Sequence, residues 1–209
     1  MASVECVWPL KADLGEGPFW SASEKALWFV DIFEKQIHRF APDTGRHQSW
    51  TAPAKVSFVL PEAWGSFLVG LPGAVARFHS QTGAFEILTR VEADTPQNRL
   101  NDACIDRRGR LWFGSMDEDS QRKSAAIYRW GAEPAPVLAD SGYCISNGPA
   151  FSPDGRTFYA TDTLDHVLYR FAVGEVGALE HKTPLIRFKP EDGFPDGTSV
   201  DAEGCLWVA

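Results

Sequence analysis

The sequence predicts an all-β protein of the β-propeller class, built on one repeat of about 45 residues. Three observations lead to this prediction. Short runs of apolar and aromatic residues recur along the chain, and an arginine next to aromatic or apolar residues follows each of the first four runs. No segment keeps a helical period over three turns. We therefore expect four-stranded sheets packed radially around a channel.

The recurrent runs are too short and too rich in β-branched and aromatic residues for helices, so we expect strands. They cover residues 26–30, 67–69, 111–113, 157–159 and 206–208. Turn residues precede several of them, as at 106–110 and 153–155. One marker residue from each run gives intervals of 40, 44, 47 and 48 residues, which are typical of propeller blades: Trp28, Leu68, Trp112, Tyr159 and Trp207.

The second recurrent feature is an arginine in a following strand. Arg39, Arg77, Arg129 and Arg170 come 11, 9, 17 and 11 residues after the first marker. The long interval contains a polar insertion at 117–124, which we interpret as a candidate binding loop. An all-β sandwich with accidental spacing is the alternative, and the constant order of two independent markers disfavours it.

Charge and hydropathy exclude several functions. The 209 residues carry a formal net charge of −8 and give a pI near 5.1, so the chain has no basic footprint for nucleic acid. No run of about 18 apolar residues occurs, and the first residues lack the basic region and apolar stretch of a secretory signal. We expect a soluble cytoplasmic protein with neither a nucleic acid nor a membrane as partner.

Polar residues recur at one phase of the repeat. They stand 12, 11, 12 and 11 residues before the marker of their blade: Glu16, Asn101, Asn147 and Asp196. The second blade has Val56 at this phase, so the ring should be open or apolar on that side. Residues at one phase of a rotational repeat lie on one ring, so we expect these side chains to converge at the channel mouth. Glycine follows three of them, which allows close backbone approach or a positive φ.

Two carboxylates and an amide oxygen form an all-oxygen ligand set that suits one divalent cation. Calcium, magnesium and manganese accept such a set readily, and zinc or ferrous iron can be held by it. None of the five histidines falls on the ring phase. The metal identity stays open at this point.

Five short motifs carry a family resemblance along the whole chain, at residues 14–18, 98–102, 114–116, 145–149 and 195–197. They read LGEGP, NRLND, GSM, ISNGP and PDG. Together they resemble the family of senescence marker protein 30 (regucalcin), gluconolactonase and bacterial sugar lactonases. The likeness is greatest to the bacterial enzymes that open pentonolactones.

The resemblance implies a six-bladed propeller that binds one divalent metal through Glu16, Asn147 and Asp196. It also implies that Arg99 and Asn101 contact the substrate. The insertion that begins at Asp117 matches a loop over the active-site mouth of the family, and we place Glu118 in this loop as a further substrate-binding residue.

The expected activity is metal-dependent hydrolysis of an aldonolactone, such as xylonolactone, arabinonolactone or gluconolactone, to the aldonic acid. The cation would polarise the lactone carbonyl, and Asp196 would act as the catalytic residue that orients or deprotonates water. Arg99 and Asn101 would hold the sugar.

Three other functions stay open at this stage. A non-catalytic, calcium-binding propeller of regucalcin type would use the same ligands, but it has no use for a cation such as Arg99 beside them. A protein-interaction scaffold would not need carboxylates at the inner phase. A propeller like strictosidine synthase would lack the ligand trio.

The length of the chain bears on how many blades it contains. We interpret residues 1–209 as one propeller domain whose C-terminal blades are missing, because six blades need about 270 residues and the chain enters only its fifth. We expect the full-length protein to be a monomer. Exposed strand edges should give the present chain low solubility or poor stability.

Overall fold

The computed structural model describes residues 4–63 and 65–209, which form four antiparallel four-stranded sheets and one two-stranded sheet. Within each sheet, strands that are consecutive in sequence are neighbours. The first two sheets contain β1 (Gly15–Ser21), β2 (Ala26–Asp31), β3 (Gln36–Ala41), β4 (Arg46–Thr51), β5 (Val59–Ala63), β6 (Ser66–Leu71), β7 (Ala74–His79) and β8 (Ala84–Arg90).

The next two sheets contain β9 (Asn98–Ile105), β10 (Leu111–Asp117), β11 (Ala125–Trp130), β12 (Val137–Tyr143), β13 (Ser146–Phe151), β14 (Thr157–Asp162), β15 (Val167–Val173) and β16 (Leu179–Arg187). A short 3-10 helix, η1 (Pro190–Asp192), leads to the two-stranded sheet of β17 (Thr198–Val200) and β18 (Leu206–Val208). The prediction of a propeller is confirmed, with four blades and part of a fifth.

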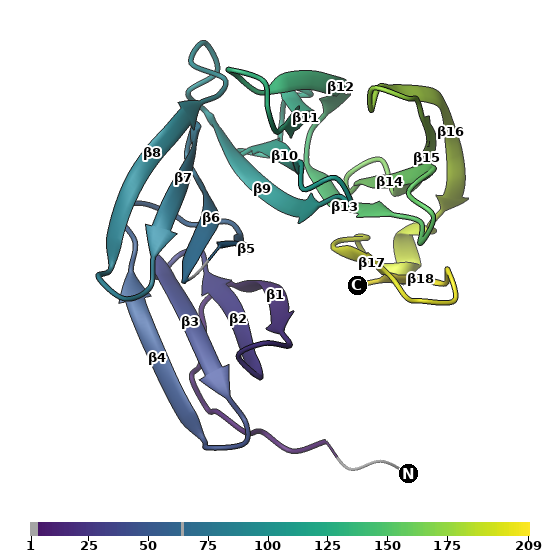
Figure 1. Cartoon of the computed structure of the whole chain (residues 1–209). Helices are drawn as coiled ribbons and strands as arrows, with labels where there is room; N and C mark the ends of the chain where they lie inside the picture. The colour runs from purple at the N-terminus through teal and green to yellow at the C-terminus, as the bar shows by residue number, and fades with distance from the viewer. Residues whose placement is uncertain (1–3, 64) are drawn as a thin grey trace.

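The blades follow one another around a common centre (Figure 1). β1, β5, β9 and β13 face this centre, whereas β4, β8 and β16 lie at the periphery (Figure 1). The inner strands of neighbouring blades contact each other, as β13 does with β9 and β17. Residues carried by the inner strands of different blades are thereby brought together.

The two sequence markers are direct cross-strand partners. Trp28 pairs with Arg39, Leu68 with Arg77, Trp112 with Arg129 and Tyr159 with Arg170. Directly opposed residues on antiparallel strands are near neighbours, so an aromatic ring and a guanidinium can pack together. In the first blade, the Arg39 guanidinium lies 5.9 Å from the centre of the Trp28 ring. The repeat therefore records one pair of facing positions on the second and third strands of a blade.

The hydrophobic core lies between blades. Trp28 of β2 packs on Phe67 of β6, with ring centroids 4.2 Å apart, and joins the first blade to the second. Trp112 of β10 packs on Phe158 of β14 in the same way, with centroids 5.0 Å apart. A third cluster around Phe58 and Phe113 joins the second and third blades. Because apolar burial is the main stabilising contribution, the blades depend on one another for stability.

A buried aspartate closes the second strand of three blades. Asp31, Asp117 and Asp162 are each paired in register with the first residue of the inner strand, and all three are at most 3% exposed. The second blade has Leu71 at this position. A buried carboxylate needs hydrogen-bond donors, so each of these residues depends on nearby backbone or side-chain groups.

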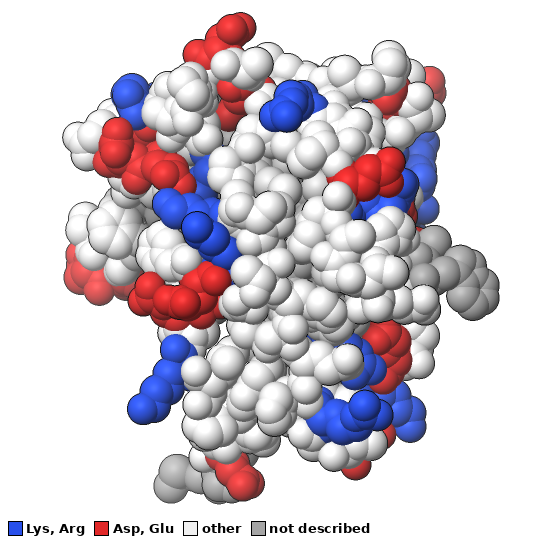
Figure 2. Space-filling model, turned by 90° about the vertical axis from the view of Figure 1, so that its left-hand side faces the viewer, with Lys and Arg blue, Asp and Glu red and all other residues white. Residues whose placement is uncertain are grey.

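Figure 2 shows the face formed by the peripheral strands of the first two blades, where acidic and basic side chains are intermixed. Arg77 illustrates this, since it pairs with Glu62 at 2.6 Å and Glu86 at 3.0 Å. This face therefore offers no continuous basic surface. In the described part of the chain, no helix has the length and apolar character needed to span a bilayer.

Candidate active site

One pocket at the centre of the blades contains the predicted ring. It is lined by Glu16 from β1, Asn101 from β9, Asn147 from β13 and Asp196, which precedes β17. Arg99 lines the same pocket, so five predicted site residues meet there. The pocket volume is about 180 Å³. Positions at one phase of the sequence repeat therefore do converge in space.

Irregular strand pairing places these side chains. The register between β1 and β2 shifts between Glu16 and Phe19, and that between β13 and β14 shifts between Asn147 and Ala150. In β9 the corresponding shift falls at residues 101–102, opposite Gly114. A β-bulge bends its strand and redirects side chains, and bulges are common next to active sites. β1, β9 and β13 thus each turn their polar residue toward the pocket at a bulge.

Glycine permits two of these bulges. Gly17 and Gly148 directly follow the predicted ligands Glu16 and Asn147. Their φ angles are 58° and 55°, which residues other than glycine rarely adopt. A Cβ atom on Gly148 would also lie 2.5 Å from the backbone nitrogen of Thr198, so this glycine lets β17 approach β13. Gly197 has neither a positive φ nor a Cβ contact below 3.8 Å, so the expectation for a glycine after each ligand holds only at Gly17 and Gly148.

A chain of hydrogen bonds orients the amide side chains. Arg99 Nη1 donates to Asn101 Oδ1 at 2.9 Å, and Asn101 Nδ2 donates to Asn147 Oδ1 at 2.6 Å. Asn147 Nδ2 donates to Thr163 Oγ1 at 3.0 Å. An amide oxygen has two lone pairs, so Asn147 Oδ1 keeps one for a further partner. Arg99 and Asn147 are only 8% and 6% exposed, so the chain is largely shielded from water.

Arg99 offsets the charge of the pocket carboxylates only in part. Burial raises the pKa of Glu16, and the nearby Asp196 and Asp102 raise it further. Burial also raises the pKa of Asp196. Within the described residues, both carboxylates receive a hydrogen bond only from the backbone of the following glycine. Burial lowers the pKa of Arg99, against the opposing effect of Glu118, Glu16 and Asp196.

These residues fit a divalent cation. Glu16, Asn147 and Asp196 offer hard oxygen atoms, and a cation would offset the repulsion between the two carboxylates. In the part of the chain that the structure describes, no three His, Cys, Asp or Glu side chains form a metal cluster by themselves. The proposed set therefore depends on the Asn147 amide.

Sequence reasoning gave no role to Asp102, which also lines the pocket. Its Oδ2 accepts a hydrogen bond from the Gly148 amide at 3.0 Å, which connects the bulges of β9 and β13. Burial raises the pKa of Asp102 to about 6. The sequence signal for Asp102 was its position directly after Asn101. In a regular strand, however, neighbouring side chains point to opposite faces, which would place Asp102 away from the pocket.

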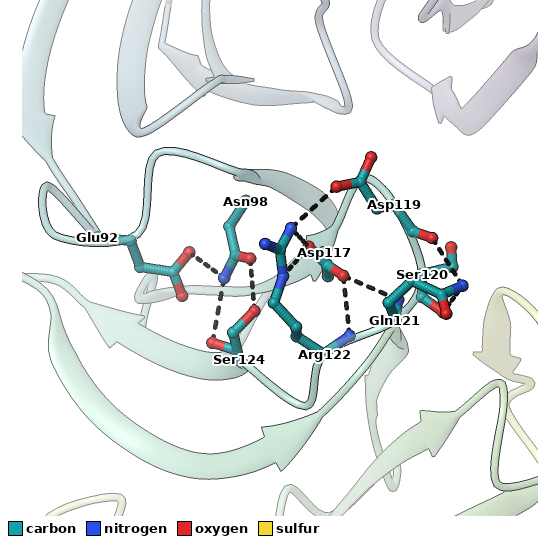
Figure 3. A network of polar contacts seen from close by, with 8 residues as sticks. All are labelled: Glu92, Asn98, Asp117, Asp119, Ser120, Gln121, Arg122 and Ser124. Carbon is teal, nitrogen blue, oxygen red and sulfur yellow. Dashed lines mark hydrogen bonds and ion pairs between the residues drawn. The ribbon is translucent and has the colours of Figure 1, made fainter.

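The insertion at 117–124 forms a tightly organised loop beside the pocket (Figure 3). The buried Asp117 accepts hydrogen bonds from the backbone of Gln121 and Arg122, and the Arg122 Nη2 atom lies 2.6 Å from Asp117 Oδ1. Ser124 Oγ donates to Asn98 Oδ1 at 2.8 Å and ties the end of the loop to β9. The pKa of Asp117 falls to about 2, chiefly because Arg122 donates to it.

Glu118 stands at the rim of the pocket and is not one of its lining residues. Its Oε1 atom lies 3.7 Å from Arg99 Nε and 2.8 Å from Lys55 Nζ. Of the predicted substrate-binding residues, Arg99 and Asn101 line the pocket, and Glu118 lies next to Arg99 outside the lining. Ser57 lines the pocket on the side of the second blade, next to the buried Val56.

Comparison with known proteins agrees with this geometry. The family described as "SMP-30/Gluconolactonase/LRE-like region" matches residues 14–209. The chain belongs to this family. Membership in the SMP-30/gluconolactonase family is consistent with the propeller fold.

Named relatives include sugar lactonases. The chain is 32% identical over 210 residues to 6-deoxy-6-sulfogluconolactonase from Pseudomonas putida, covering 99% of this chain and 72% of that protein. It is 34% identical over 200 residues to L-arabinolactonase from Azospirillum brasilense, covering 94% of this chain and 66% of that protein.

A solved structure of the same family shares the fold. The crystal structure of a calcium-binding protein, regucalcin, from Agrobacterium tumefaciens matches with a TM-score of 0.88 at 28% identity. The match covers 94% of this chain and 67% of that protein, which is a six-bladed propeller. The four blades and the two further strands of this chain thus match about two thirds of the regucalcin chain.

Proposed function

We propose that this protein hydrolyses an aldonolactone to the aldonic acid with the help of one divalent metal ion. The supporting observation is a single pocket that combines three oxygen ligands with the hydrogen-bonded pair Arg99 and Asn101. A buried guanidinium repels a neighbouring cation, so its presence indicates a second ligand that carries oxygen atoms. A lactone with its ring hydroxyls meets this requirement.

Glu16, Asn147 and Asp196 are the residues that would hold the metal, which supplies Lewis-acid polarisation of the lactone carbonyl when bound. The metal is one of Ca²⁺, Zn²⁺, Mn²⁺, Mg²⁺ or Fe²⁺. Asn101 orients the Asn147 oxygen, and Thr163 holds the opposite side of the same amide. The hydrogen-bonded amides thus preorganise one ligand before any metal arrives.

Asp196 acts as the base in this proposal. It lies in the same pocket as Arg99 and Asn101, and a carboxylate beside the reacting centre can accept a proton from water. It takes a proton from water while the water oxygen bonds to the acyl carbon. The bond between that carbon and the ring oxygen breaks, and the ring oxygen receives the proton. Arg99 and Asn101 hold the sugar oxygens during these steps.

The named relatives guide the choice of substrate. Their printed names refer to a sulfogluconolactone and to L-arabinolactone, which are hexono- and pentonolactones. We propose a small aldonolactone of five or six carbons. The exact sugar follows from a screen of both classes.

Lactone opening releases a proton from the acid product, so a pH-stat measures it directly. We expect no activity after chelation and recovery when one divalent metal is added back. Asp196→Ala should lower kcat by about 10²-fold or more. Asp192→Ala, which changes a nearby exposed carboxylate, serves as the control.

Unchanged activity in Asp196→Ala would exclude the proposed role of this residue. Tight metal binding by the wild-type chain without opening of any lactone in the panel would favour a non-catalytic calcium-binding role. The two outcomes are separated because calorimetry measures metal binding without turnover.

A further inference from the structure

Three charged side chains from separate parts of the chain meet at the rim of the pocket. Lys55 lies in the segment between β4 and β5, Arg99 in β9, and Glu118 in the loop after β10. Lys55 Nζ is 2.8 Å from Glu118 Oε1, and Arg99 Nε is 3.7 Å from the same oxygen. One carboxylate oxygen is therefore shared by two cations, closely by Lys55 and loosely by Arg99.

Arg99 is the fixed member of this group. Its side chain is 9% exposed, and its Nη1 atom donates to the Leu100 carbonyl at 3.0 Å as well as to Asn101. The side chains of Lys55 and Glu118 are 34% and 38% exposed. The Glu118 oxygen is within hydrogen-bond distance of Lys55 Nζ and just beyond that distance from Arg99 Nε.

Lys55 is held on the other side of Glu118. Its ammonium lies 5.4 Å from the centre of the Phe33 ring, so an aromatic face as well as a carboxylate fixes its position. Glu118 is anchored through its backbone, which donates to the Gln97 carbonyl at 3.1 Å. The carboxylate of Glu118 is thus the movable group, and the two cations compete for it.

We propose that Lys55 is a positioning residue that holds Glu118 away from Arg99 and so keeps the guanidinium free for the substrate. This inference rests on the proposed lactonase function. Without Lys55, Glu118 pairs directly with Arg99, and neither side chain is then free for the sugar oxygens. Weaker substrate binding follows, whereas the step at Asp196 is unaffected.

A purely structural role of the pair predicts something different. An exposed ion pair contributes about 0–1 kcal/mol to stability. If the Lys55–Glu118 pair only stabilised the fold, its loss would slightly lower stability and leave substrate affinity unchanged. Substrate affinity, turnover and salt dependence therefore distinguish the two roles. An exposed pair is also screened by salt, so the effect of Lys55 should shrink as ionic strength rises.

The experiment compares Lys55→Met with Lys55→Arg, which keeps the charge. KM and kcat are measured for the lactone that the wild-type protein opens fastest, and Kd for the corresponding aldonate is measured by calorimetry. Lys182→Met is the matched control, because Lys182 pairs with Asp140 at 2.6 Å, is 35% exposed and also lies over an aromatic ring. Unfolding midpoints of all variants verify that they fold.

We expect Lys55→Met to raise KM and the aldonate Kd about fivefold, with kcat within about twofold of wild type. Lys55→Arg and Lys182→Met should match the wild type. The difference between Lys55→Met and wild type should decrease at high salt.

A double-variant cycle tests the route through Glu118. Adding Lys55→Met to Glu118→Gln should cause no further rise in KM or Kd, because the competing carboxylate is already gone. Wild-type KM and Kd in Lys55→Met, or a full additional rise in the double variant, would overturn the inference. A wild-type chain that binds aldonate but opens no lactone contradicts the proposed function, and the Kd values still decide the role of Lys55.

Discussion

At the scale of single residues, the pocket gathers carboxylate and amide oxygen atoms whose charge Arg99 offsets only in part. Glu16 and Asp196 are half-buried carboxylates that raise each other's energy, and Asn147 presents an amide oxygen whose orientation is fixed by Asn101. Such a set favours a cation over a neutral ligand, because the two carboxylates carry more charge than Arg99 balances. The geometry therefore leads to a prediction about metal binding that is independent of catalysis.

Glu16→Gln should weaken divalent-metal binding by at least about tenfold, because it removes one of two anionic ligands. Calorimetric titration of the chelator-treated protein measures this change. Glu24→Gln is the control, since Glu24 pairs with Arg39 at 2.8 Å outside the pocket. Equal metal affinity of Glu16→Gln and wild type would exclude Glu16 as a ligand.

At the scale of elements, the second strand of three blades ends in a buried aspartate, and the surroundings of this aspartate differ between blades. Asp31 accepts hydrogen bonds from the backbone of Asp13 at 2.8 Å and Leu14 at 3.1 Å, which fixes the approach to β1 and Glu16. Burial alone would raise the pKa of Asp31, but these donors and Glu34 lower it. Burial raises the pKa of Asp162, which has fewer donors. Equivalent positions of the repeat therefore have opposite pH behaviour.

Asp31→Asn should reduce the free energy of unfolding by about 1–3 kcal/mol at neutral pH. A carboxyl with a lowered pKa stabilises the fold above its unfolded value near 3.9 and loses that effect as pH falls through the folded pKa. The difference in unfolding free energy between wild type and Asp31→Asn should therefore become smaller below about pH 4. Denaturant unfolding at several pH values measures it.

Asp162→Asn is the matched comparison and should show the opposite trend. A raised pKa means that the folded state holds its proton more tightly, so the ionised carboxylate lowers stability as pH rises above its unfolded value. We expect Asp162→Asn to be about as stable as wild type at neutral pH, and relatively less stable in acid. The same trend in both variants would contradict this assignment.

At the scale of the whole molecule, stability comes from contacts between blades. Trp112 is fully buried between β10 and β14, and its Nε1 atom donates to Asp106 Oδ2 at 3.0 Å. Trp207 makes the equivalent bond to Asp201 Oδ2 at 3.0 Å, yet it is 64% exposed. The chain thus contains the same local pair with and without packing from a neighbouring blade.

Trp112→Ala should cost about 3–5 kcal/mol of unfolding free energy, because it removes a large buried side chain and leaves a cavity. Trp207→Ala should cost less than about 1 kcal/mol, since it removes only an exposed ring and one hydrogen bond. Chemical denaturation of both variants measures the difference. Similar losses would show that the local pair, and not packing between blades, determines stability.

The sequence alone determined the repeat and the phase of the ring. The spacing of Trp28, Leu68, Trp112, Tyr159 and Trp207 predicted the strands, and the first four of these markers each face an arginine in the next strand. The phase predicted that Glu16, Asn101, Asn147 and Asp196 share a pocket, since a rotational repeat maps one phase onto one ring. Both results depend on local periodicity, which a linear sequence contains.

Only the tertiary structure decided how the site is built around that ring. Asp102 enters the pocket because a bulge interrupts the alternation of β9, and Lys55 reaches Glu118 because segments 63 residues apart meet at the rim. The opposite pKa shifts of Asp31 and Asp162 depend on which backbone donors face each carboxyl. These features depend on bulges, backbone donors and contacts between blades, and no sequence period records them.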